Sequence, residues 1–550
     1  MEAAIAVLAW GLSALCQDSH ATQWIAPICP LNTTVELASR LSANAQIYSP
    51  GSEGFTEATL RWSSFEVPGI NLVVVPSVER DVAETVKYAN RKNIPYIAVA
   101  GGHGAIITES KVKNGIEIWM HQLNTVEIGK DSAKIGGGAL SKTVTHALWT
   151  AGKQTVTGGC ECTGLVGPGL GGGHGLLQGR HGLISDQFIS MNIVLASGDI
   201  QILDETSDLW WAVQGAGHNF GIVTSVTMRI YDVHHPNWAY EMFTFTVDKV
   251  EGLYNKLNVH LLNNGSPPVN IFNYGFIMNN PEIDSNPVTM FWILQEGATS
   301  VDSVYTKPFH ELGPTAINAG SGIYLDVPRW IGWDDDAAPC QHSGLANTRY
   351  PIDIQSYNVQ SMRKLYDLFT DVTKKTPELN SSHFLFEGYS LKGVKAVPSE
   401  STAYPFRDDN LLVAPVISWV PSGQDIAQKA INFGKSLRQI LYEGTGRSEL
   451  HTYVNYAFGD ETLMNWYGYE QQRQDRLLAL KNKYDPHLQE VTSAKPDKMK
   501  WDWMRAVATG PIPAGLVGDI PYSICKVRDP EDLELLDSVT LKLLDLDHLE

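Results

Sequence analysis

The amino-acid sequence predicts an α+β protein of two domains, the first of which is built in two lobes. A strand–helix–strand unit begins at Ile70, and a second block of short strands follows from Ile116. Glycine is concentrated between Gly158 and Gly182, and near residue 236 the chain changes to aromatic-rich strands and helices. Because 550 residues exceed the roughly 100–200 residues of a typical domain, more than one domain is expected.

The first lobe begins with a buried strand over residues 70–75, an apolar run that Pro76 ends. Ser77 is then placed to be the N-cap of a helix whose apolar residues recur at helical spacing. A second strand over residues 94–99 leads into the turn Gly101-Gly102-His103-Gly104. Since α/β folds bind ligands beyond the carboxyl ends of their strands, this turn is a candidate binding site.

The rest of the chain divides into further elements by its hydrophobic pattern. Strands are expected over residues 116–120, 126–128, 189–196, 200–203 and 222–230, and helices over 140–151 and 461–484. A strand is also expected just after residue 450. The domains that follow are 40–235, 236–449, a return of the chain to the first domain over 450–500, and a tail over 501–550.

Residues 1–17 read as a possible signal peptide. An apolar run of the right length begins at Ala3, although Glu2 stands in a region that normally carries Lys or Arg. This pattern predicts a secreted protein. Sequons that permit glycosylation stand at Asn32, Asn264 and Asn380. No later stretch has the roughly 18 consecutive apolar residues that a membrane helix needs, so no membrane span is expected.

Charge and cysteine content exclude two classes of site. The net charge of −19 is the opposite of the basic surface that nucleic-acid-binding proteins show, so nucleic acid is not an expected partner. The six cysteines, at positions 16, 29, 160, 162, 340 and 525, lack the spacing of zinc ligands, so no metal site is expected.

The run Gly167-Pro-Gly-Leu-Gly-Gly172 fits the G-x-G-x-x-G pattern of a Rossmann dinucleotide site, but its context does not. No clean strand leads into it, Pro168 interrupts it, and no acid lies at the required distance, because Asp186 and Asp199 fall on either side of that position. Backbone N–H groups without Cβ atoms are nevertheless what close approach to a pyrophosphate requires. Tight turns are the alternative, and they account for only a few of these glycines.

His103 and Cys160 are the reactive side chains set among glycines. A lone histidine is most often a structural residue, but a neutral imidazole in a glycine turn is an accessible nucleophile. For Cys160, between Gly159 and Gly164, a disulfide partner or a buried thiol is the alternative. Cysteines two residues apart rarely reach the geometry of a disulfide, so Cys160 and Cys162 are expected to differ in their bonding partners.

Six segments follow one another in the order of a known family. They are Val74-Val-Pro-Ser with the Gly-Gly-His turn, Cys160 eleven residues before Gly171-Gly172-Gly173, Leu170-Gly-Gly-Gly-His-Gly with Arg180-His-Gly-Leu, Leu209-Trp-Trp-Ala, Gly215-Ala-Gly-His-Asn-Phe-Gly-Ile-Val-Thr, and Tyr453-Val-Asn-Tyr456 with Lys483-Tyr-Asp-Pro486. Over roughly residues 60–490 the chain resembles the berberine-bridge-enzyme-like flavoproteins of the vanillyl-alcohol-oxidase superfamily, particularly the fungal secreted oxidases.

The resemblance implies a two-lobed PCMH-type FAD-binding domain and a substrate domain with an antiparallel sheet covered by helices. FAD is then the expected cofactor, bonded through its 8α-methyl group to His103, with Cys160 as a second attachment at C6. Further cofactor-binding residues carried over from the family's motifs are Gly101, Gly102, Gly104, Gly159, Gly164, Gly171, Gly172, Gly173, His174, Gly175, Gly221 and Ile222.

The expected activity is the transfer of a hydride from a small-molecule substrate to flavin N5, with molecular oxygen as the acceptor and a place in fungal secondary metabolism. Tyr456 is the first candidate base and Tyr453 the second; the alternative is that both tyrosines fill the seam between domains. On a strand they would face opposite sides, so that only one would reach the flavin. A phenol is a poor base near neutral pH unless its phenolate is stabilised.

Departures from the family pattern leave the substrate open. The strand before Tyr404-Pro-Phe-Arg-Asp-Asp is read as lacking the carboxylate that some members use as base, with Tyr389, Lys392 and Lys395 nearby instead. Two other functions stay open: a flavoprotein cyclase, and a flavin-binding protein without significant turnover. Aromatic residues that suit either an apolar substrate or a hydrophobic core are Phe272, Tyr274, Phe276, Phe291, Trp292, Tyr324, Trp330 and Trp333.

Disulfide pairing also stays open at this point. If Cys160 is bonded to the flavin and Cys16 leaves with a signal peptide, Cys29, Cys162, Cys340 and Cys525 remain. Four cysteines allow two disulfides in three pairings, and the sequence favours none of them. In a cytosolic protein all of them would be free thiols.

Overall fold

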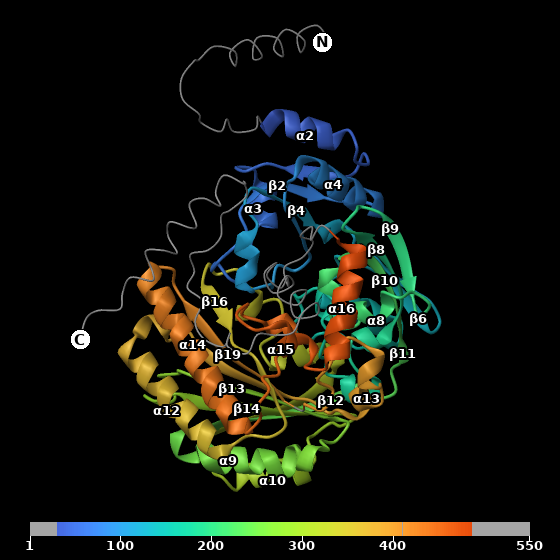
Figure 1. Cartoon of the computed structure of the whole chain (residues 1–550). Helices are drawn as coiled ribbons and strands as arrows, with labels where there is room; N and C mark the ends of the chain where they lie inside the picture. Colours follow the sequence, from blue (N-terminus) through green and yellow to red (C-terminus); the bar gives the residue numbers. More distant parts are fainter. Residues whose placement is uncertain (1–29, 410, 487–550) are drawn as a thin grey trace, which may run out of the picture. The chain divides into compact units, whose positions relative to one another are not determined.

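Three larger sheets and a two-stranded sheet make up the β-structure of the described residues (Figure 1). The computed structural model describes residues 30–409 and 411–486, so the possible signal peptide at 1–17 and the tail at 501–550 lie outside it. The described residues belong to one compact unit, and the domain boundaries at 235 and 449 stay predictions. No helix in these two ranges is both long enough and apolar enough to cross a membrane.

The first sheet confirms the predicted strand–helix–strand unit. β2 (Ile70–Val75) and β3 (Tyr96–Val99) both run parallel to β4 (Gly115–Trp119), which lies between them, and β1 (Gln46–Tyr48) pairs antiparallel with β2. Helix α4 (Glu79–Lys92) connects β2 to β3 and buries its apolar face in the same hydrophobic core as the sheet. The glycine turn that follows β3 is therefore at the carboxyl end of a parallel strand, as expected.

The predicted N-cap of α4 is wrong by one residue. Val78 is the N-cap, and its side chain cannot accept a hydrogen bond. The Asp81 carboxylate, at the third helical position, instead accepts the N–H groups of Ser77 and Val78 at 3.0 and 3.1 Å. Ser77 keeps its hydroxyl for a hydrogen bond with Ser42. A carboxylate at this position satisfies free N–H groups at the helix start as well as a capping hydroxyl does.

The second sheet contains strands where they were expected over 126–128, 189–196, 200–203 and 222–230, whereas the strand expected over 116–120, assigned to this block from the sequence, is β4 of the first sheet. Its order is β5-β6-β10-β8-β9, and every neighbouring pair is antiparallel. The strands are β5 (Val126–Ile128), β6 (Ser132–Gly136), β8 (Phe188–Leu195), β9 (Ile200–Asp204) and β10 (Gly221–Arg229). Helix α5 (Ser141–Thr150) lies where a helix was predicted, and the small pair β7 (Lys153–Gln154) and β11 (Tyr231–Asp232) completes this part.

The third sheet is antiparallel throughout and has the order β15-β12-β14-β13-β18-β19-β16, with β17 also paired to β19. Its strands are β12 (Asn237–Phe245), β13 (Ile271–Met278), β14 (Val288–Glu296), β15 (Ala316–Ile323), β16 (Ala346–Arg349), β17 (Ile352–Ile354), β18 (His383–Gly388) and β19 (Leu411–Trp419). One face is covered by α9 (Val250–Lys256), α10 (Ser303–His310), α12 (Val359–Lys375) and α14 (Gln424–Thr445), as Figure 1 shows. This is the antiparallel sheet covered by helices that the resemblance implies.

The pleat of this sheet decides which residues can reach a ligand. In β18, Phe384 and Phe386 lie in the core beneath the helices, whereas His383, Leu385 and Glu387 point to the opposite face, where they line a cavity. Alternate residues of a strand face opposite sides of a sheet, so a strand that is buried throughout still presents every second side chain to the cavity.

The chain after residue 450 differs from the prediction. No strand forms between residues 450 and 462; a 3₁₀ turn, η13 (Val454–Tyr456), takes its place. The predicted helix over 461–484 is split into α15 (Leu463–Tyr467) and α16 (Gln471–Tyr484). Gly468 lies between them with φ 91°, a conformation that ends a helix and that residues with a Cβ atom rarely adopt.

Candidate active site

A cavity of about 650 Å³ lies where the glycine-rich segments meet the uncovered face of the third sheet. Its wall brings together residues from positions 61 to 457. The residues predicted for the site that line it are Gly101, Gly102, His103, Gly104, Gly159, Cys160, Gly164, His174, Gly221, Ile222, Tyr453 and Tyr456. One cavity therefore contains both the residues proposed to bind a cofactor and those proposed for catalysis.

The turn after β3 needs its glycines for space and for backbone shape. A Cβ atom on Gly101 would collide with the carbonyl oxygen of Cys162, and Gly102 has φ 67°. The N–H groups of Gly102, His103 and Gly104 donate to no acceptor within the described ranges. Backbone donors of this kind are available to a ligand that enters the cavity.

His103 lies on the cavity wall as a neutral imidazole. Burial, together with the smaller effect of the positive charge of Arg349, lowers the pKa of His103 to about 3. Its Nε2 atom is 3.1 Å from the Sγ atom of Cys162. Because a neutral imidazole keeps a lone pair, this residue can act as a nucleophile at ordinary pH.

The sulfurs of Cys162 and Cys340 lie beside His103, and the sulfur of Cys160 lies next to them. Cys162 and Cys340 form a disulfide, which is one of the bonds that the three possible pairings contain, whereas Cys29 and Cys525 lie outside the described residues. Cys160 is a free thiol whose Sγ atom is 3.6 Å from that of Cys162 and 3.7 Å from that of Cys340. Burial raises the pKa of the Cys160 thiol to about 12, so the thiol is protonated in this environment.

Four of the predicted cofactor-binding glycines lie behind the cavity wall instead of on it: Gly171, Gly172, Gly173 and Gly175. A Cβ atom on Gly172 would meet the Tyr404 ring, and one on Gly173 would lie 2.7 Å from Ile184. Close packing is a sufficient reason for glycine at these positions. Within the glycine-rich run, the cavity is instead lined by the short helix α6 (Val166–Leu170) and the residues before it.

Glu387 is the site residue that the sequence reading missed. The strand that was read as lacking a carboxylate is β18, and it carries Glu387 on the cavity face. Tyr456 donates its O–H to Oε1 of Glu387 at 2.9 Å, and Tyr389 donates to Oε2. Burial raises the pKa of Glu387 to about 7, although the two tyrosine hydroxyls and Arg349 oppose that rise. A signal was present in the sequence, since one acid stands in an otherwise apolar strand.

Tyr453 and Tyr456 both reach the cavity, contrary to the expectation for a strand. They stand at the start and the end of the 3₁₀ turn η13, where residues three apart lie on the same side. Their ring centroids are 5.3 Å apart in an edge-to-face arrangement. The Tyr453 oxygen accepts hydrogen bonds from the His174 N–H at 3.3 Å and from the Asn455 side chain at 2.6 Å.

His174 is held inside a group of aromatic residues. Its Nδ1 is 2.9 Å from the Gln178 Oε1 atom, and its Nε2 is 3.1 Å from the Tyr404 hydroxyl. The imidazole also stacks on the Tyr389 ring with centroids 5.3 Å apart. Burial lowers the pKa of His174 to about 4, so the ring is neutral and positions the tyrosines around Glu387.

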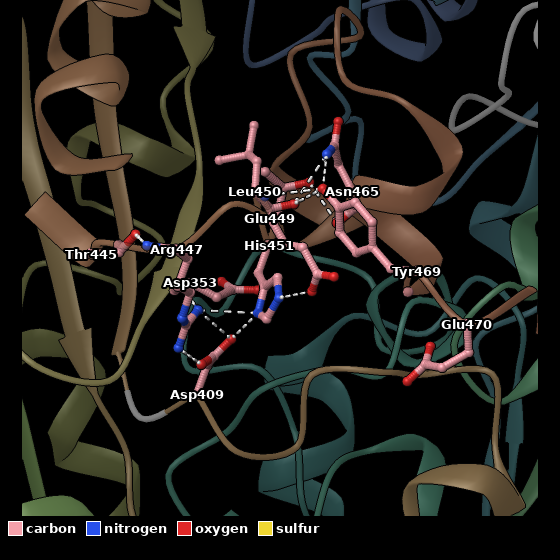
Figure 2. Close-up of polar contacts among 12 residues, drawn as sticks. Asp353, Asp409, Thr445, Arg447, Glu449, Leu450, His451, Asn465, Tyr469 and Glu470 are labelled. Atoms are coloured by element: carbon pink, nitrogen blue, oxygen red, sulfur yellow. Dashed lines mark hydrogen bonds and ion pairs between the residues drawn. The ribbon is translucent and has the colours of Figure 1, made fainter. Parts of the chain in front are cut away.

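A polar network fixes the segment that carries the two tyrosines, as Figure 2 shows. Asp409 accepts hydrogen bonds from the Arg447 guanidinium and lies 2.7 Å from Nδ1 of His451. The N–H of Asp353 donates to the His451 carbonyl at 2.9 Å, which ties this segment to β17. Asn465 donates to the carbonyl of Leu450 at 3.1 Å, which joins α15 to the same segment.

The aromatic residues between positions 271 and 333 divide between the two predicted roles. Tyr274 and Trp333 line the cavity, and the Trp333 indole donates a hydrogen bond of 2.9 Å to the Tyr274 hydroxyl. Phe291 lies in the core beneath the helices. Other cavity residues were missed because their own segments carry no motif: Trp62, Glu109, Arg349 and His383.

Comparison with known proteins assigns the chain to a family. The FAD binding domain family matches residues 70–204. An FAD-linked oxidoreductase of Penicillium rubens, chyH, is 49% identical over 490 residues, which cover 88% of this chain and 98% of that protein. The solved structure of Physcomitrella patens BBE-like 1 matches with a TM-score of 0.70 at 20% identity, covering 84% of this chain and 98% of that one. The chain belongs to the FAD-linked oxidoreductases, and it shares the fold of the berberine-bridge-enzyme-like protein of Physcomitrella patens. A second member of the family, chry5 of Gibberella zeae, is 49% identical with 82% and 92% of the two chains covered. Chitooligosaccharide oxidase shares the fold, with a TM-score of 0.70 at 20% identity over 84% of this chain and 99% of that one.

The protein is therefore an FAD-dependent oxidoreductase, and the cavity fits this cofactor. The glycine turn offers free N–H groups next to His103, and the glycine-rich run lets backbone approach the cavity closely. The buried Oε1 atom of Glu109, on the cavity wall, has no hydrogen-bond partner within residues 30–409 and 411–486. A buried acceptor without a partner is expected where a bound molecule supplies one.

Proposed function

We propose that the protein is an oxidase that takes a hydride from a small-molecule substrate and uses molecular oxygen as the acceptor, within fungal secondary metabolism. The observation that carries the proposal is the buried Glu387 carboxylate, hydrogen-bonded to Tyr456 on the wall of the cavity. The fungal origin of the FAD-linked relatives and the oxidases among the structural neighbours support it. Bound in this cavity, FAD would supply the two-electron acceptor.

Tyr456 and Glu387 together form the base that hydride removal requires. Burial raises the pKa of the Tyr456 phenol well above its ordinary value, so Tyr456 alone is a poor base. Because its O–H already points at Glu387, a substrate proton can move to the Tyr456 oxygen while the Tyr456 proton moves to Glu387. A pKa of about 7 suits Glu387 to accept that proton near neutral pH. Tyr389 holds the second carboxylate oxygen and so fixes its orientation. Tyr453 stays the second candidate.

Covalent attachment of the flavin through His103 is part of the proposal. The position of the neutral His103 ring on the cavity wall supports it, as does the family motif in which the histidine stands. Cys160 lines the same cavity and is proposed as the second attachment point. Its raised pKa opposes thiolate formation, so we propose that the bond to His103 does not depend on Cys160.

Secretion is proposed on two observations that are independent of the first 17 residues. The disulfide between Cys162 and Cys340 is of a kind that persists in oxidising compartments. Asn380, which begins one of the three sequons, is exposed. Intact mass of protein from the culture medium of its fungal host, before and after removal of N-glycans, tests both secretion and glycosylation.

The oxygen step can be tested without knowing the substrate. The holoenzyme is reduced with dithionite under argon and mixed with oxygenated buffer while flavin absorbance and hydrogen peroxide are measured. We expect complete reoxidation within seconds, at a rate proportional to oxygen concentration, with one peroxide formed per flavin. Reoxidation over many minutes, or without peroxide, would refute oxygen as the acceptor.

The base is tested with substrates that reduce the flavin anaerobically. Glu387→Gln should slow this reduction strongly, whereas Tyr389→Phe, which keeps the carboxylate, should slow it much less. Equal effects of the two changes would remove Glu387 from the proposed role. Ring closure of a substrate without oxygen consumption would identify the cyclase alternative instead.

A further inference from the structure

Arg349 places a positive charge on the wall of the cavity, close to the proposed base. It is the last residue of β16, and its guanidinium carbon lies 3.9 Å from the centroid of the Trp62 ring and 4.8 Å from that of Tyr456. Its guanidinium makes no hydrogen bond and no ion pair with any residue in the ranges 30–409 and 411–486. The two ring faces hold the side chain in place but leave its N–H donors unused.

Glu387 interacts with Arg349 electrostatically, but no acidic residue in the described ranges forms an ion pair with it. Both oxygens of Glu387 already accept hydrogen bonds from tyrosines. Glu109 is the other carboxylate on the cavity wall, and burial raises its pKa to about 7. The charges that act on Glu109 are those of Arg61 and Glu117. The nearby rings of His103 and His383 are neutral, because burial lowers both of their pKa values. The N–H donors of the guanidinium therefore face the cavity without an anion hydrogen-bonded to them.

A desolvated guanidinium without a counter-ion is unfavourable, and burial accordingly lowers the pKa of Arg349. Arginine stays charged under all ordinary conditions, so a partner has to come from whatever enters the cavity. A carboxylate matches the planar fork of the guanidinium with two parallel hydrogen bonds. Tyr274, Met278, Leu385 and Val416 line the same cavity and offer apolar surface to the rest of a bound molecule.

We propose that Arg349 binds the carboxylate of the substrate, and that the substrates are carboxylic acids with an apolar body. The proposal rests on the proposed function, because it places the acid beside the Tyr456–Glu387 base. Arg349 is then a specificity-determining residue, since an amide or ester of the same shape offers no charge to the guanidinium. Discrimination of this type arises when the wrong ligand leaves a buried charged group unpaired.

The test is a binding titration of the holoenzyme followed by the change in flavin absorbance, which needs no turnover. Two matched pairs of probes are used: benzoate with benzamide, and 2-naphthoate with 2-naphthamide. Wild-type protein should bind at least one acid about tenfold or more tightly than its amide. Arg349→Met should remove this preference by weakening the acid alone, and Arg349→Lys should keep part of it. Arg80→Met, an exposed arginine on α4 away from the cavity, is the control and should change nothing.

Several results would overturn the proposal. Equal affinity for acid and amide in wild type, or no spectral change with either acid, would show that the cavity does not select carboxylates. If Arg349→Met kept its flavin and also kept the preference for acid over amide, a group other than the guanidinium would bind the carboxylate. Each of these outcomes leaves the oxidase proposal intact as long as the dithionite-reduced flavin still reacts rapidly with oxygen.

Discussion

Replacing Glu387 by glutamine should stabilise the protein at alkaline pH and have little effect on stability at acidic pH. Burial moves the pKa of this carboxyl from 4.5 to about 7, so the folded state resists its ionisation. The stability that the protonated group contributes is fully present below the unfolded pKa and is lost as pH rises through about 7. At about 1.4 kcal/mol for each pH unit, the loss amounts to about 3 kcal/mol. Glutamine keeps the shape and cannot ionise.

Urea unfolding followed by tryptophan fluorescence measures this effect at about pH 5 and about pH 8. The free energy of unfolding of Glu387→Gln, relative to wild type, should increase between the two pH values by roughly 2–3 kcal/mol. Glu109 has a similarly raised pKa of about 7, so its contribution is present in both proteins and cancels in the comparison. A relative stability that is the same at both pH values would refute the reasoning, because it would mean that Glu387 ionises freely in the folded protein.

Three other measurements follow from the site. The kcat/KM for any substrate that reduces the flavin should fall about tenfold per pH unit below about 7 and become flat in Glu387→Gln; a wild-type profile that is also flat would show that Glu387 is not the base. Intact mass of denatured wild type should include one FAD, which Cys160→Ala should retain through His103, His103→Ala should retain only in part through Cys160, and the double variant should release; FAD that leaves the denatured wild type would exclude both bonds. Cys340→Ser opens a disulfide whose cysteines are 178 residues apart and should lower the free energy of unfolding by about 2–5 kcal/mol in the absence of reductant, whereas a variant as stable as wild type would mean that the bond is not formed in solution.

Local sequence signals predicted most strands of the first two sheets, although not β1 or β6. A run of apolar residues predicts the strand at 70–75, and apolar residues at helical spacing predict the helix after it. Both elements form as the local sequence indicates. The N-cap was harder to predict, because the carboxylate of Asp81 takes the place expected for the Ser77 hydroxyl. The order of the motifs was equally informative for the cofactor, since the family's glycine segments follow one another along this chain in the family's order.

Predictions failed where the outcome depended on contacts between distant segments. Tyr453 and Tyr456 were expected on a strand, but no partner strand lies beside them, and the segment is held by His451, Asp409 and their neighbours as a 3₁₀ turn. That change in geometry turns both tyrosines toward the cavity. Glu387 was overlooked because a strand buried on both faces shows no alternation of apolar and polar residues that would mark its cavity side.

The sequence by itself determined the cofactor class, the family and most strands of the first two sheets, because each of these depends on short segments read one at a time. Only the tertiary structure decided which side chains share the cavity. Trp62, Arg349 and Glu387 come from three separate segments, and it is the pairing of β16 and β18 with β19 that places the last two on one face. The charge and the base of the site thus arise from strand register and pleat, which fix side-chain direction across a sheet and leave no mark in the local sequence.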